Sequence, residues 1–99
     1  MVKCRRTMQH KELRYPDRQK LSEDESATLV YENQYSGTVV EKEVHITDVT
    51  GCVSVQTERG AEWGVFGSMI RTSVNNRRQS GTVNPKNGRT LGYLVEIRQ

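Results

Sequence analysis

The sequence predicts a mainly β fold, a small antiparallel barrel of five or six strands that follows a flexible basic arm. Segments in which apolar and polar residues alternate recur along the chain, and this period of two is the pattern of a strand with one buried face. Clusters rich in Gly, Asn, Asp and Pro, which are typical of turns, separate these segments. The chain has 99 residues, of which 33% are hydrophobic, so it supports one compact domain, and several short strands in such a domain favour a barrel.

Residues 1–21 are predicted to form the flexible basic arm, and residues 22–99 the single barrel domain. Met8 and Leu13 lie five positions apart, which fits neither a helix nor a strand, and Pro16 disfavours a helix at Tyr15. The arm has seven basic residues among its first 20 and no apolar stretch, so it is not expected to be a secretory signal. An arm of this kind becomes ordered either on a partner or against the body of its own domain.

The segment after the arm combines a helix signal with a strand signal. Residues 22–25, Ser-Glu-Asp-Glu, form a capping-box pattern with acids where a helix N-terminus favours them. Residues 28–31, Thr-Leu-Val-Tyr, are a compact run of β-forming residues. We therefore expect one helical turn followed by a strand.

The clearest strand pair is a hairpin that closes on residues 48–51. Between residues 38 and 47, the apolar side chains Val40, Val44 and Ile46 occupy even positions, and the alternation resumes at residues 53–57. One register satisfies both faces of such a hairpin. It pairs Ile46 with Val53, Val44 with Val55, Thr47 with Cys52, His45 with Ser54 and Glu43 with Gln56.

Three further features complete the predicted barrel. A three-residue loop containing Gly60 is expected to oppose Val55 with Val65 and Thr57 with Trp63. The glycines at positions 64 and 67 indicate a bulge or a sharp bend. The last strand is expected at residues 90–98, and Trp63 and Tyr93 are expected in the core. Leu91, Tyr93, Val95 and Ile97 share one face of that strand. The pattern does not distinguish an SH3-like from an OB-like connection order.

The net charge of +3 conceals three blocks of alternating sign. Residues 1–20 carry +5, residues 21–62 carry −7 and residues 63–99 carry +5. Such blocks either neutralise one another in the folded domain or present separate faces to partners. The charge pattern is therefore the feature that bears most directly on function.

The basic blocks predict a nucleic-acid-binding protein that contacts the phosphates of RNA or single-stranded DNA. Residues 71–90 contain five basic residues, several amide side chains and no acid. Guanidinium groups bind phosphate in bidentate fashion, and exposed aromatic rings stack on bases. The candidate binding residues are Arg71, Arg77, Arg78, Lys86 and Arg89, with Arg5 and Arg6 of the arm and the rings of Tyr35 and Phe66.

The acidic block predicts an alternative, a compact protein-binding module or inhibitor, such as an accessory protein of a mobile element. Its acidic strand face, formed by Glu41, Glu43, Glu58 and Glu62, is expected to meet a basic surface on a protein partner. A homodimer is a third interpretation, because exposed strand edges pair with a second copy.

The sequence does not predict an enzyme, a cofactor or a metal site. Cys4, His10, His45 and Cys52 lack the short spacings that preorganise zinc sites. His45, Cys52 and Ser54 share one face of the expected hairpin, but a two-stranded polar face supplies neither an oxyanion site nor a cleft. No apolar run is long enough to cross a membrane, and the two cysteines are expected as free thiols in a reducing cytoplasm.

Overall fold

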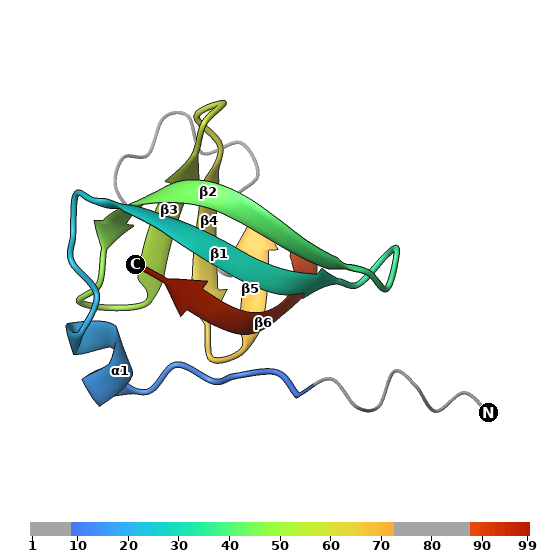
Figure 1. The fold of residues 1–99 in the computed structure, drawn as a ribbon, viewed down its shortest axis with the longest axis horizontal. Helices are drawn as coiled ribbons and strands as arrows, with labels where there is room; N and C mark the ends of the chain where they lie inside the picture. The colour runs from blue at the N-terminus through green and yellow to red at the C-terminus, as the bar shows by residue number, and fades with distance from the viewer. Residues whose placement is uncertain (1–8, 73–87) are drawn as a thin grey trace.

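The computed structural model describes residues 9–72 and 88–99, which form a closed antiparallel β-barrel with one short helix at its side (Figure 1). Each strand pairs with its neighbours in the sequence, and the last strand pairs with the first to close the barrel. The prediction of a small antiparallel barrel is confirmed, with six strands. The elements are α1 Tyr15–Gln19, β1 Ser26–Asn33, β2 Val39–Asp48, β3 Val53–Thr57, β4 Glu62–Phe66, β5 Met69–Thr72 and β6 Thr90–Arg98.

The core fills the inside of the barrel with aliphatic side chains from every strand. Leu29, Ile46, Val53, Ile70 and Leu94 are all 0% exposed. On β2 the even positions face inward as predicted, because burial alternates along the strand up to Ile46. Trp63 is buried as expected, and its ring packs edge-on against Tyr31 with centroids 5.8 Å apart. The alternation in the sequence therefore identified the correct buried face of β2.

Burial of Tyr31 makes the stability of the barrel sensitive to alkaline pH. Removal from water raises the pKa of the Tyr31 phenol above its ordinary value of 10.0. The unfolded chain therefore ionises at this residue before the folded chain does. This contribution to stability is complete below pH 10 and is lost as the pH rises further. We expect urea unfolding to show a steeper loss of stability above pH 10 in the native chain than in Tyr31→Phe, and equal slopes would contradict this origin.

The β2–β3 hairpin forms with a register different from the predicted one. Val44 faces Thr57 and Ile46 faces Val55, which is a shift of two residues, and His45 faces Gln56 instead of Ser54. The connection lies one residue further along the chain than expected: residues 49–52, and not 48–51, lie between the strands, and Asp48 Oδ1 accepts hydrogen bonds from the N–H and the hydroxyl of Thr50. An irregularity between Ile46 and Asp48 shifts the pairing by one further residue, so that Asp48 faces Ser54. The predicted register is therefore wrong, although the faces are right.

The β3–β4 pair shows the same kind of shift. Val53 faces Val65 and Val55 faces Trp63, instead of the predicted partners. The loop does have three residues, because Thr57 N–H donates to Ala61 O at 2.8 Å across it, and Gly60 has the left-handed φ of 89° that such loops favour. Thr57 therefore lies opposite Ala61, and every cross-strand pair of β3 and β4 differs from the predicted pair by two residues. Gly67, with φ 63°, lies in the tight β4–β5 turn, as the prediction of a sharp bend required.

The last strand has the predicted limits, and Leu91 and Ile97 of its predicted face pack against the core, but its fully buried side chain is Leu94 of the other face. Leu94 is 0% exposed, whereas Tyr93 is only partly buried and stacks on the ring of His10 at 5.2 Å between centroids. Pairing irregularities on both sides of β6, between Val30 and Tyr31 and between Ile70 and Arg71, change which side faces the core. The prediction of Tyr93 as a core residue is therefore wrong.

The expected helical turn at residues 22–25 does not form. Asp24 N–H donates to Ile46 O at 2.7 Å, and Ile46 N–H donates to Glu25 O at 2.9 Å, so the backbone here already hydrogen-bonds to β2. Asp24 adopts a left-handed φ of 63°, which a helix does not allow. β1 begins directly afterwards at Ser26, and the run of β-forming residues belongs to it.

Residues 9–21, the described part of the predicted arm, lie against the barrel. Lys11 N–H donates to Leu94 O at 2.7 Å, and Leu13 and Leu21 pack against the core. Helix α1 forms despite Pro16, because this proline occupies the first turn, where its missing N–H breaks no helical hydrogen bond. The arm was expected to become ordered either on a partner or against its own domain, and residues 9–21 are ordered against the domain. The boundary at residue 21 stays a prediction.

Candidate functional site

The four acidic residues selected from the sequence gather on the outer surface of the barrel around β2, β3 and β4. Glu41 and Glu43 alternate with inward-facing residues on β2 and are exposed. The pairing of Val44 with Thr57 brings Glu43 beside Glu58, which follows β3. Glu62 on β4 faces Gln56, which in turn faces His45. We call Glu41, Glu43, Glu58 and Glu62 the acidic face.

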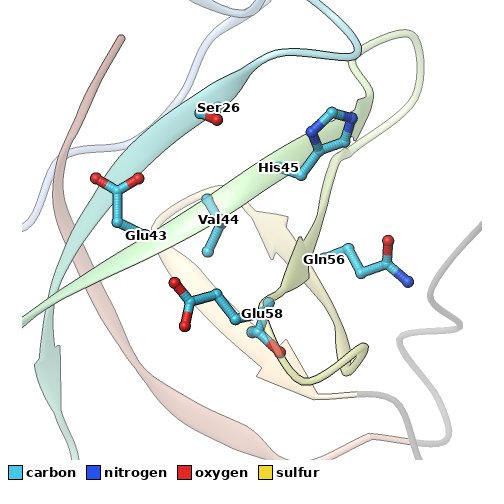
Figure 2. A pocket seen from close by; sticks show the side chains of 7 residues that line it. Ser26, Glu43, Val44, His45, Gln56 and Glu58 are labelled. Carbon is cyan, nitrogen blue, oxygen red and sulfur yellow. The ribbon is translucent and has the colours of Figure 1, made fainter.

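A hollow of about 160 Å³ lies within the acidic face (Figure 2). Val44 and Thr57, a directly facing pair, are the two buried residues that line it. The side chains of Glu43 and Glu58 lie to one side of Val44, and those of His45 and Gln56 lie to its other side (Figure 2). Ser26 of β1 completes the lining. The hollow therefore has a small floor and walls that carry two carboxylates.

The carboxylates of the acidic face differ in how far they are already neutralised. Glu41 pairs with the guanidinium of Arg98 at 3.2 Å, and Arg98 also binds Glu96 at 2.6 Å. Hydrogen bonds to Glu96 and then to Glu41 raise the pKa of Arg98 above its ordinary value, so this bridge stays charged. Glu43 accepts a hydrogen bond from the Thr28 hydroxyl, at 3.1 Å. Among residues 9–72 and 88–99, neither Glu43 nor Glu58 forms an ion pair.

The nucleic-acid candidates are only partly placed by the structure. Arg5, Arg6, Arg77, Arg78 and Lys86 lie outside the described residues. Tyr35 is 65% exposed in the β1–β2 turn, Arg89 is exposed before β6, and Phe66 at the end of β4 is partly buried. The bond from Gln34 N–H to Leu91 O, at 3.0 Å, brings the β1–β2 turn beside the start of β6. Tyr35 and Arg89 therefore lie on neighbouring segments, while Phe66 precedes a different turn.

Arg71 has a structural role in this barrel. Its guanidinium donates to Gly88 O at 2.6 Å and to the Thr90 hydroxyl at 3.2 Å, so it joins the end of β5 to the start of β6. Both bonds are partly buried, and a charged donor in such a place contributes more than an exposed one. Two of the guanidinium N–H donors are therefore committed within the fold.

Replacing Arg71 is therefore expected to lower stability. Arg71→Ala should decrease the free energy of unfolding by about 1–2 kcal/mol, because the Gly88 carbonyl and the Thr90 hydroxyl lose their partner. Arg89→Ala is the matched control, since Arg89 is exposed, and it should change stability by less than about 0.5 kcal/mol. Urea unfolding measures both. Equal stability in the two variants would contradict the structural role.

Within the described residues, the other polar side chains considered in the sequence make separate local contacts. His10 binds Glu32 at 2.5 Å, and His45 lies 3.9 Å from Asp24. Cys52 Sγ lies 3.8 Å from Ser54 Oγ, but the observed register pairs His45 with Gln56 instead of Ser54. In the described ranges no three His, Cys, Asp or Glu side chains are close enough to hold a metal ion. Cys52 is a free thiol, and Cys4 lies outside the described residues.

Comparison of the chain with protein-family models, with curated proteins and with solved structures finds no match. The helix in the described part of the chain is too short and too polar to cross a membrane. Functional inference therefore depends on the geometry of the barrel surface. His45, Gln56 and Ser26, which line the hollow, were not among the residues selected as binding candidates. The period of two on β2 does place His45 on the same face as Glu43, and this signal was available in the sequence.

Proposed function

We propose that this chain is a non-enzymatic protein-binding module whose acidic face recognises a basic surface on a partner protein. The observation that carries the proposal is that Glu43 on β2 and Glu58, directly after the paired strand β3, line the same hollow and form no ion pair among the described residues. Like charges placed together cost stability in the free protein, and a basic partner relieves that cost. A module of this kind is able to act as an inhibitor, because it presents the same sign of charge as a phosphate backbone to a basic site.

The barrel suits such a role because it is a rigid support. β2, β3 and β4 carry the acidic face or lead into it, and the core residues Ile46, Val55 and Val65 behind them are at most 2% exposed. Surface groups on paired strands keep their positions when a partner approaches, so little ordering entropy is lost on binding. Glu96 and Arg98 lie on β6 and Glu41 lies on β2, so their ion pairs connect the two strands across β1 beside this face.

The direct test is binding of a fluorescein-labelled nonapeptide of arginine, followed by anisotropy at several salt concentrations. The native chain should bind, and Glu43→Lys with Glu58→Lys should abolish binding. Glu12→Lys is the matched control, because Glu12 is an exposed acid outside the acidic face. Binding of the double variant at native affinity would refute the proposal. Circular dichroism spectra establish that the variants are folded.

Binding to RNA or single-stranded DNA is the second candidate, and the observation that favours it is the exposure of Tyr35 beside the segment that carries Arg89. The same anisotropy measurement with a labelled dT₂₀ strand and a labelled U₂₀ strand tests it. Binding that weakens with salt in a linear log–log relation, and that is lost on exchanging Arg77 and Arg78 for Glu, would favour this function. Unchanged affinity in that double variant, or no binding at low salt, would exclude it.

A further inference from the structure

The hollow in the acidic face is matched to one type of side chain. Its lining carries two carboxylates, from Glu43 and Glu58, and the amide of Gln56. A planar guanidinium has five donors in a fixed fork and forms bonds with two acceptors at once, which an ammonium does only as a point charge. We infer that the hollow receives a single arginine side chain of the partner protein, an inference that depends on the proposed function.

The hollow has features that a bare acidic cluster lacks. It is an open depression of about 160 Å³, situated over the paired residues Val44 and Thr57. These two residues are 5% and 7% exposed, so the hollow has a buried floor and charged walls. The methylene part of an arginine side chain lies on such a floor while its guanidinium reaches the carboxylates. Shape and charge therefore select the same ligand group.

The remaining contacts of the lining leave the two carboxylates available. Glu43 accepts one hydrogen bond, from the Thr28 hydroxyl, and this contact orients the carboxylate without neutralising it. His45 lies 3.9 Å from Asp24. The nearest cationic bridge, at Arg98, is satisfied by Glu96 and Glu41. The arginine of a partner therefore binds at Glu43 and Glu58 without displacing an ion pair among the described residues.

Nuclear magnetic resonance titration of the full ¹⁵N-labelled chain tests this inference with three hexapeptides, of arginine, of lysine and of citrulline. The arginine peptide should shift the backbone amides of Val44, His45, Gln56, Thr57 and Glu58 more than the other assigned amides. The lysine peptide should bind at least about threefold more weakly because it lacks the fork, and the uncharged citrulline peptide should not bind.

Two double variants test whether the arginine peptide binds in the hollow. Glu43→Gln with Glu58→Gln keeps the shape of both side chains and should weaken binding of the arginine peptide by roughly tenfold. Glu41→Gln with Glu12→Gln removes the same amount of charge outside the lining. It should weaken binding clearly less than the first variant, because Glu41 belongs to the acidic face but is already paired with Arg98. The amide spectra of both variants report whether the barrel is intact.

The outcomes separate the inference from the function on which it depends. Shifts spread over the acidic face, an equal affinity for the arginine and lysine peptides, or equal weakening by both double variants would overturn the arginine site. In these cases, a diffuse acidic binding face would still stand. Absence of binding by any cationic peptide would overturn the arginine site and the proposed function together.

Discussion

Gly92→Ala is expected to prevent the barrel from closing or to destabilise it severely. A Cβ atom at this position would lie 2.1 Å from the carbonyl oxygen of Glu32, which belongs to the facing strand β1. That atom is backbone, so no side-chain rotation relieves the overlap, and the β1–β6 pair has to separate locally. We expect the free energy of unfolding to fall by at least about 3 kcal/mol, measured by urea unfolding.

The control for this variant is Gly51→Ala in the β2–β3 connection. A Cβ atom at Gly51 meets no atom within 4 Å, and Gly51 does not have a left-handed φ. We expect a change of less than about 0.5 kcal/mol. If Gly92→Ala were as stable as Gly51→Ala, the close approach of β6 to β1 at this point would be disproved.

Removal of residues 1–21 is expected to destabilise the barrel strongly. The deletion removes Leu13 and Leu21, which pack against the core, and the bond from Lys11 N–H to Leu94 O. It also removes Arg18, whose guanidinium donates to the Gly51 carbonyl. Loss of two partly buried leucines alone accounts for about 3 kcal/mol of unfolding free energy.

Removal of residues 1–8 is the matched comparison, because it retains all of these contacts. We expect its unfolding midpoint in urea to stay close to that of the full chain, while the longer deletion shifts the midpoint to a much lower concentration. Equal midpoints for the two deletions would show that residues 9–21 are an independent arm, as the sequence suggested.

The sequence identified the strands and their buried faces better than it identified which residues face each other on neighbouring strands. Alternation along β2 is a local property, so it predicted that Val44 and Ile46 are buried and that Glu41 and Glu43 are exposed. A shift of two residues leaves every side chain on the same face, so the alternation pattern could not distinguish the observed register from the predicted one. The position of the connection between β2 and β3 decided the register, and the hydrogen bonds of Asp48 define that connection.

The hollow escaped prediction for the same reason. In the predicted register Glu43 faced Gln56, whereas the observed pairing of Val44 with Thr57 brings Glu43 next to Glu58. Helix α1 was missed because the rule applied to Pro16 concerns the residue before a proline, while position 16 in the helix is its first turn. The structural role of Arg71 was not visible either, since its acceptors, Gly88 and Thr90, are 17 and 19 residues away in sequence.

Closure of the barrel by β1 and β6 affects how the chain reaches its native state. Residues 26–33 pair with residues 90–98, so the sheet cannot be completed until residue 98 has left the ribosome. Until then both outer strands of the unfinished meander offer unpaired backbone groups, and such edges bind to other chains. Closing a pair that is so distant in sequence is also slow, because loop-closure entropy is lost before the contacts form. Nascent or truncated forms that lack β6 should therefore be the aggregation-prone forms of this protein.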